Sequence, residues 1–192
     1  MRQFNKLVSV ASATLLLFST LAIAQTSPGK SGSEETPDQK EVRVFRLTEA
    51  KLDQYQNATK GVVKVLHQHP EIQKKMDQES TAPLEKDEGE VDRSAKSIEA
   101  HIEVSGAVKD SGLSVRDYVV MTITLVNSMM LVAMKKQGLI PEYPPSISQG
   151  NAAFVEQHYD RVGDIIRPLM ESSMPQSDSK DQGSDKKKSD PN

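Results

Sequence analysis

The sequence predicts an all-α protein, a small bundle of four or five helices around a central apolar helix at about residues 115–136. Apolar residues recur at helical spacing through most of residues 42–171, whereas only the short stretch "VRV" alternates as a strand would. Cysteine and tryptophan are absent and aromatic residues make up 4% of the chain, so the core has to consist of aliphatic side chains and methionine. A length of 192 residues is typical of one domain.

The start of the chain has the composition of a signal peptide. Arg2 and Lys6 precede an apolar run that ends in the small-x-small sequence Ala22-Ile23-Ala24. A segment of this kind directs export and is removed afterwards. We therefore predict a signal peptide over residues 1–24 and a mature protein in the periplasm or outside the cell. An uncleaved membrane anchor is the alternative.

Two polar segments flank the predicted domain. Residues 25–41 and 172–192 are rich in Ser, Gly, Pro and charged residues, and they hold too little apolar surface to offset the entropy cost of ordering. We expect a disordered linker and a disordered polar tail there, and a helical domain over residues 42–171. The three lysines at 186–188 lie among aspartates, which is typical of a solvated segment.

Charge and the absence of cysteine exclude several classes of protein. Loss of Arg2 and Lys6 with the signal peptide changes the formal net charge from −3 to −5. A mildly acidic protein lacks the concentrated basic surface that general nucleic-acid binding needs. Without cysteine the chain forms no disulfide, and it has no thiol nucleophile and no cysteine-type zinc site.

Capping signals place the first predicted helix at about residues 49–67. Thr48 is suited to the N-cap position, and Leu47 and Leu52 are suited to form a hydrophobic staple around it. The inward face follows helical spacing and comprises Leu52, Tyr55, Thr59, Val62, Val63 and Leu66. Pro70 can open a short second helix at its first position. The preceding stretch "EVRVFRL" alternates briefly and is compatible with an extended segment.

Two further helices lie on either side of the central one in the sequence. The third helix is expected at about residues 91–109 and ends at Ser111-Gly112, where glycine can adopt the left-handed conformation. Asn151 is suited to cap the fifth helix, and Pro168 should kink or end it. The inward face of the third helix is predicted to comprise Val91, Ala95, Ile98, Ile102 and Ser105 or Val108, and that of the fifth to comprise Val155, Tyr159, Val162, Ile166 and Leu169.

The central helix has the end signals of a soluble helix. Ser114 and Asp117 are suited to a capping box at its start, and Gly138 is suited to the C′ position at its end. Its uncharged stretch of 17 residues, from Tyr118 to Met134, spans about 25 Å at about 1.5 Å per residue, which is less than the roughly 30 Å of a bilayer core.

Polar residues on the central helix form one narrow stripe, and the other sides are apolar. The stripe comprises Asp117, Thr124, Ser128 and Lys135. A helix of this kind is typically the central helix of a bundle. We therefore predict a core helix and no transmembrane span in the mature chain.

Motifs that carry catalysis or phosphate binding are missing from the sequence. It contains no GxSxG nucleophile motif, no GxxxxGK[ST] or GxGxxG phosphate loop and no HExxH zinc motif. His67 and His69 are two residues apart, a spacing that separates side chains on a helix, and His101 and His158 have no partner at ligand spacing. Methionines are expected to fill the core rather than to bind copper(I). We predict no catalytic residue, no metal ligand and no cofactor.

Three residues are candidates for a functional surface: Arg116, Tyr118 and His158. The first two begin the central helix, and His158 lies two turns into the last predicted helix. Antiparallel packing of these two helices would put Arg116 and Asn151 at opposite poles of the bundle. The candidate residues would then not form one site.

Parts of the sequence resemble a family of small exported bacterial proteins. The resemblance rests on "LTEAKLDQYQNAT", "GLSVRDYVVMTITLVNS" and "NAAFVEQHYDRV", and it covers residues 48–67 and 112–166. The matching positions are Gly112, Leu113, Arg116, Tyr118, Asn151, Phe154 and His158. The resemblance implies an exported helical domain of bacterial origin and brings no activity with it.

Export, a helical core and the lack of a catalytic motif together predict a non-enzymatic protein that binds a partner protein or a small apolar ligand. A periplasmic metal- or haem-binding protein that uses His67, His69 or His158 together with methionines is the alternative. A hydrolase that uses Arg116, Tyr118 and His158 is a third alternative and has the least support.

Overall fold

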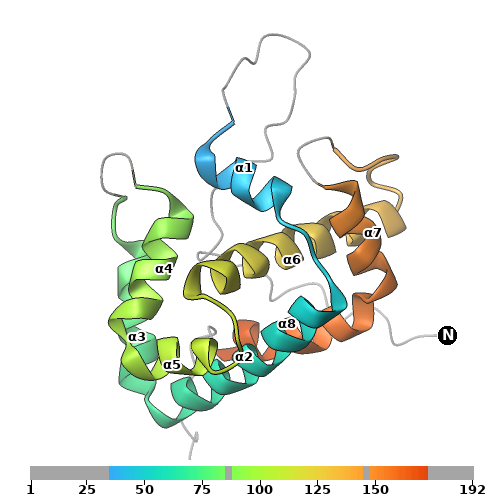
Figure 1. The fold of residues 1–192 in the computed structure, drawn as a ribbon. Coiled ribbons are helices and arrows are strands. Elements are labelled where there is room, and N and C mark those ends of the chain that lie inside the picture. The colour runs from blue at the N-terminus through green and yellow to red at the C-terminus, as the bar shows by residue number, and fades with distance from the viewer. Residues whose placement is uncertain (1–34, 85–87, 145–147, 173–192) are drawn as a thin grey trace, which may run out of the picture.

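The structure, a computed structural model, describes residues 35–84, 88–144 and 148–172. These residues form eight helices and no strand, which confirms the predicted all-α fold (Figure 1). The predicted signal peptide and nearly all of the predicted polar tail lie outside the described residues. The helices are α1 (Pro37–Val44), α2 (Glu49–Gln68), α3 (Pro70–Thr81), α4 (Glu90–Ala100), α5 (Ile102–Lys109), α6 (Val115–Lys136), α7 (Gln149–Gln157) and α8 (Tyr159–Ser172).

The number of helices exceeds the predicted four or five for two reasons. Helix α1 forms ahead of the first predicted helix, within and just after the segment expected to be a linker. The third and fifth predicted helices are each divided in two, at His101 and at His158. The remaining helices agree with the predicted ranges to within a few residues.

Helix α6 lies at the centre of the bundle. In Figure 1 it passes between α1 above and α2 and α8 below, with α4 and α7 packed at its two ends. By length and composition it is the one helix in the described ranges that could cross a membrane, with a mean hydropathy of 1.5 over its most apolar stretch. Within the domain, 56% of that stretch is buried. Its role here is that of a core helix.

Ser114 and Gly138 occupy the predicted cap positions of α6, but the predicted capping box is not formed, because the Asp117 carboxylate accepts from the Ser114 hydroxyl at 2.8 Å instead of from its amide. The Ser114 hydroxyl accepts a hydrogen bond from the Asp117 amide at 2.9 Å. At the other end Gly138 has a φ of 71°, and the amide of Leu139 donates to the carbonyl of Met134 at 2.9 Å. This is the Schellman arrangement, which satisfies carbonyls that the end of a helix leaves open.

The middle of the polar stripe of α6 does not face solvent, although Lys135 at its end is exposed. Thr124 and Ser128 are both buried. The Thr124 hydroxyl donates to the Val120 carbonyl one turn back at 2.7 Å, which satisfies it within the helix. The Ser128 hydroxyl has no hydrogen-bond partner among the described residues. Small hydroxyl side chains therefore serve here as packing positions inside the core.

The predicted third helix breaks at His101, which ends α4 and precedes α5. The break turns the chain, so that Ile102 is 77% exposed rather than inward as its spacing predicted. In exchange α5 buries Val104 and Val108 against α2. At the crossing a Cβ atom added to Gly61 would come within 3.0 Å of the Ala107 Cβ, so small residues allow the close approach.

The segment "EVRVFRL" is not extended, because its first half belongs to α1. Thr36 and Gln39 form a capping box at the start of this helix, with the Gln39 amide donating to the Thr36 hydroxyl at 3.2 Å. None of the residues in α1 is fully buried. The Asp38 carboxylate accepts a hydrogen bond from the Val91 amide at 3.1 Å, which fastens α1 to the start of α4.

The start of α7 is capped by Ser148 instead of the predicted Asn151. Asn151 is 2% exposed and has a different role. Its Oδ1 accepts from the Leu47 amide at 3.1 Å, and its Nδ2 donates to the Phe45 carbonyl at 2.8 Å. One buried amide thus holds the connection between α1 and α2 against α7. Pro168 does not end the last helix, since α8 continues to Ser172.

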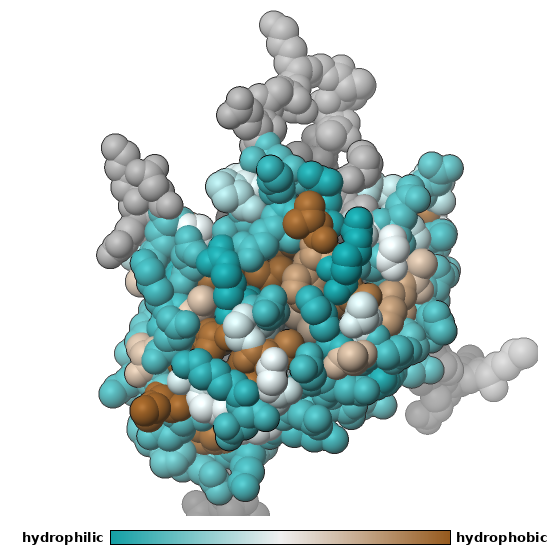
Figure 2. Space-filling view, viewed as in Figure 1, coloured by the Kyte–Doolittle hydropathy of each residue, from teal (hydrophilic) through white to brown (hydrophobic). Residues whose placement is uncertain are grey.

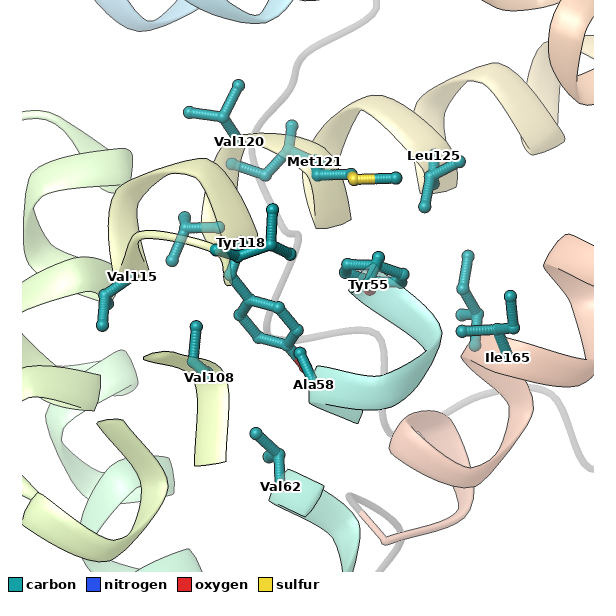
Figure 3. Packing of buried hydrophobic residues seen from close by; sticks show 14 of the residues in the cluster. Tyr55, Ala58, Val62, Val108, Val115, Tyr118, Val120, Met121, Leu125 and Ile165 are labelled. Carbon is teal, nitrogen blue, oxygen red and sulfur yellow. The ribbon is translucent and has the colours of Figure 1, made fainter. Parts of the chain in front are cut away.

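The core is aliphatic, as expected, but two tyrosines lie at its middle. Figure 3 shows Tyr55 of α2 and Tyr118 of α6 among branched aliphatic side chains, with Ile165 of α8 nearby. The two tyrosine rings stack with their centroids 5.1 Å apart. Met121 is fully buried beside them, which agrees with the expected role of methionine as a core residue.

Candidate functional site

Arg116, the first of the three candidate residues, connects three helices. Its side chain is 48% exposed and forms ion pairs with Glu41 of α1 at 2.7 Å and Asp92 of α4 at 2.5 Å. These two carboxylates raise the pKa of Arg116 above its ordinary value through hydrogen bonds and charge. The guanidinium is therefore occupied in holding α1 and α4 to the start of α6.

Tyr118 does not belong to any surface, because it is 5% exposed. Burial raises the pKa of Tyr118 to about 12, and the neighbouring Thr59 hydroxyl partly opposes that rise. The Tyr118 hydroxyl nevertheless forms no hydrogen bond with any described residue. The Tyr55 hydroxyl, in contrast, lies 3.0 Å from the Thr122 hydroxyl. Tyr118 is a core residue with an unsatisfied polar group.

His158 lies at the joint between α7 and α8. Its Nε2 is 2.8 Å from a carboxylate oxygen of Glu49, and its ring packs against Phe154 with centroids 4.5 Å apart. The same glutamate also pairs with Arg161 at 3.2 Å, and Arg161 further contacts Asp53. This network joins α8 to the start of α2. It has no member in common with the partners of Arg116, so the candidate residues are not brought together.

The residues of the metal-binding alternative are also dispersed. His69 Nδ1 is 3.1 Å from Glu71, whereas His67 points outward from the end of α2. Over residues 35–84, 88–144 and 148–172, no group of three or more His, Asp or Glu side chains is placed to hold a metal ion. The methionines differ in environment too, since Met121 is fully buried and Met130 is exposed.

One cluster contains the serine, histidine and carboxylate of a hydrolase triad, but they are not hydrogen-bonded to one another in the order that catalysis needs. The Ser97 hydroxyl donates to one oxygen of Glu79, and His101 Nε2 is 3.8 Å from the other oxygen. A catalytic serine needs its hydroxyl bonded to the imidazole, which acts as the base. Here the carboxylate takes that hydroxyl. The cluster therefore joins α3 to α4 and does not favour hydrolysis.

A groove of about 450 Å³ runs between α2 and α8, and we refer to it as the α2–α8 groove. It is open along one side. Figure 1 shows the two helices lying side by side at the base of the molecule. The residues that line it are Gln56, Thr59, Lys60, Val63, Lys64, His67 and Gln68 from α2 and Asp164, Ile165 and Pro168 from α8.

The inner wall of the α2–α8 groove is apolar. Val63 and Pro168 are half-buried, and Ile165 is buried on the side of α8 that faces the core. Pro168 lies inside α8 and contributes an apolar ring to this wall; because it has no amide hydrogen, the carbonyl of Asp164 lacks its usual donor within the helix. A hydrocarbon group in this groove would meet aliphatic side chains from both helices.

The outer edge of the groove is basic. Lys60, Lys64 and His67 recur at intervals of four and three residues, which places them on one face of α2, and all three are exposed. Asp164 supplies the acidic group on the opposite edge, and it pairs with Arg167 at 2.9 Å. The groove is therefore positively charged although the chain as a whole is acidic.

Sequence reasoning missed this groove. The stripe of basic residues beside Val63 was visible as a pattern, but its spacing resembles that of any solvated helix face. Which helix lies next to it depends on the fold, because α8 is about a hundred residues further along the chain.

Comparison of the chain with protein-family models, with curated proteins and with solved structures finds no match. The resemblance to small exported bacterial proteins accordingly stays a prediction. Any functional conclusion has to rest on the geometry of the domain itself.

Figure 2 shows one face of the domain, most of which is hydrophilic. Apolar side chains reach the surface across its middle, in the band between α1 and α2, and hydrophilic side chains interrupt and surround them. The exposed large hydrophobic residues come from different helices and connections: Val44, Leu84, Ile102, Met130, Leu139 and Met170. Apolar residues scattered in this way are ordinary for a soluble protein.

Proposed function

We propose that the protein is exported and non-enzymatic, and that it binds a small apolar ligand in the α2–α8 groove. The observation that carries the proposal is the apolar inner wall formed by Val63, Ile165 and Pro168 in an open groove of about 450 Å³. Sites for small-molecule ligands are concave, mostly apolar and of roughly 300–1,000 Å³. The predicted signal peptide supports export.

The non-enzymatic part of the proposal rests on the polar groups described above. Arg116, His158 and Ser97 are each engaged in contacts that join helices. None of them is paired as a nucleophile with a base. Neither the metal-binding nor the hydrolase alternative is favoured by a specific contact in the described part of the chain.

The test is binding of an uncharged apolar dye, Nile red, to the mature protein, residues 25–192. Saturable fluorescence enhancement with one site per chain is expected. Val63→Phe should fill the groove and weaken binding at least about tenfold, a change of about 1.4 kcal/mol. Val65→Phe is the matched control, since Val65 is also half-buried on α2 but does not line the groove.

The pattern of results across the two variants decides the proposal. Weakening by Val63→Phe alone supports the groove as the site. Equal weakening by both variants, or no saturable binding by the parent protein, would overturn it. Urea unfolding of both variants has to show that each still folds.

A further inference from the structure

We propose that the ligand of the α2–α8 groove is a long-chain carboxylate, that is, a fatty acid in its ionised form. Its hydrocarbon chain would lie along the apolar wall, and its carboxylate would face Lys60, Lys64 and His67 on the α2 edge. The inference rests on the proposed function, because it names the chemical class of ligand for the same groove.

The first argument is the charge of the basic edge. Lys60, Lys64 and His67 are exposed, and no carboxylate among the described residues lies within 4.0 Å of their nitrogen atoms. Arg161, near the start of α2, is by contrast already engaged with Glu49 and Asp53. The charge of the basic edge is therefore available to an anionic ligand.

The opposite edge does not cancel this charge. Asp164 is the acidic residue among those that line the groove, and its carboxylate accepts a hydrogen bond from Arg167 Nη2 at 2.9 Å. An anion bound along the α2 edge would meet one paired carboxylate across the groove and, beside it, three basic side chains that form no ion pair with any described residue. Charge complementarity thus favours a negative head group over a positive one.

The shape of the groove favours a single hydrocarbon chain. Its α2 edge extends from Gln56 to Gln68, about 18 Å at about 1.5 Å per residue. The apolar wall follows the same direction, since Ile165 and Pro168 lie on successive turns of α8. The methylene stems of Lys60 and Lys64 can also pack along a hydrocarbon chain while their ammonium groups stay in water.

The identity of the basic residues favours a carboxylate over a phosphate head group. Bidentate recognition of phosphate uses the planar fork of arginine, and backbone amides at a helix start also bind phosphate, whereas lysine binds it only as a point charge. The groove is lined by lysine and histidine without arginine, and it follows the middle and end of α2. Lysine acts as a point charge, which suits a singly charged carboxylate at an exposed edge.

Calorimetric titration of the mature protein with three ligands of one chain length tests the inference: dodecanoate, dodecanol and dodecyltrimethylammonium, each below its micelle concentration. Because the basic side chains are exposed, their charges contribute modestly, and we expect dodecanoate to bind about fivefold more tightly than dodecanol. The cationic amphiphile should bind most weakly. Added salt should reduce the preference for dodecanoate.

A double variant isolates the basic edge. Lys60→Gln with Lys64→Gln should abolish the preference for dodecanoate over dodecanol. Both ligands lose the same contact with the lysine stems, so the ratio of their affinities isolates the effect of charge. Lys74→Gln with Lys75→Gln is the matched control, because these lysines are exposed on α3 and do not line the groove, and the change in net charge is the same. The control should keep the preference.

The outcomes separate the inference from the proposed function. If none of the three ligands binds saturably, the proposed function itself fails. If all three bind with equal affinity, the groove is an apolar site and the carboxylate assignment is overturned. Loss of the preference in the α3 control would also overturn it, as would tighter binding of dodecyl phosphate than of dodecanoate.

Discussion

Replacement of Asn151 by alanine should be among the most damaging single changes to the stability of this domain. The side chain is 2% exposed, and it makes two hydrogen bonds to the chain between α1 and α2. Alanine removes both. The amide of Leu47 then has no acceptor, and it is itself in a buried residue. The Phe45 carbonyl belongs to a half-buried residue and can regain water more easily.

The magnitude follows from these two groups. A buried donor left without a partner costs about 1–3 kcal/mol, and a carbonyl that can rehydrate lies at the lower end of that range. We therefore expect Asn151→Ala to reduce the free energy of unfolding by about 2–4 kcal/mol. A domain of this size has about 5–15 kcal/mol in total, so the loss is a large fraction.

Urea unfolding of the mature protein, followed by circular dichroism, measures this loss. With a urea dependence of about 2 kcal/mol per molar, the middle of the usual range, the midpoint should fall by about 1–2 M. Ser148→Ala is the control for the capping role that the sequence predicted for Asn151. It removes an N-cap with a long bond of 3.4 Å, and should cost about 1 kcal/mol or less.

A second substitution tests the buried bonds themselves. Asn151→Asp keeps an acceptor for the Leu47 amide but loses the donor to the Phe45 carbonyl. A protonated carboxyl group can donate where an ionised one cannot, so this variant should be less destabilised at acidic than at neutral pH. If Asn151→Ala costs less than Ser148→Ala, the two hydrogen bonds of Asn151 do not contribute the stability assigned to them and the reasoning is refuted.

Three further predictions concern α6. Ser128→Ala removes a buried hydroxyl without a partner among the described residues, so the free energy of unfolding in urea should stay unchanged or rise by up to about 1 kcal/mol. A clear decrease in that free energy would mean that the hydroxyl does have a hydrogen-bond partner. Burial raises the pKa of Tyr118 from 10.0 to about 12, so the folded state holds this proton more tightly than the unfolded state, and stability should fall as pH rises from 10 to 12. Tyr118→Phe should lessen that fall in urea titrations at alkaline pH, and an unchanged fall would contradict the assignment. Arg116→Ala should speed hydrogen exchange in α1 while changing overall stability by only about 1 kcal/mol, because the ion pairs are partly exposed. Protection of α1 that survives both this change and high salt would show that α1 is held by apolar packing instead.

Much of the fold was predictable because the signals that end helices are local. Thr48, Ser114 and Gly138 each interact with residues three or four positions away, and the structure confirms all three. The long apolar helix could be assigned to the core for the same reason, since its caps and its length are properties of the sequence.

The candidate site was less predictable. Tyr118 was expected at a functional surface, but its place near the start of a helix did not reveal that Tyr55 stacks on it. Arg116 and His158 have carboxylate partners on α1 and α2 that lie 75 or more residues away in the chain. Spacing within a helix predicts which residues share a face, but it does not predict which other helix packs against that face.

The sequence by itself thus determined the helical class, most helix ends and the composition of the core, because these depend on interactions over a few residues and on apolar periodicity. Only the tertiary structure decided where helices break, what Asn151 binds and where a groove opens. The break at His101 leaves Ile102 exposed, whereas Val104 and Val108 are buried against α2. The local sequence pattern does not indicate which of these residues is buried. The α2–α8 groove likewise exists only because two helices distant in the chain pack side by side.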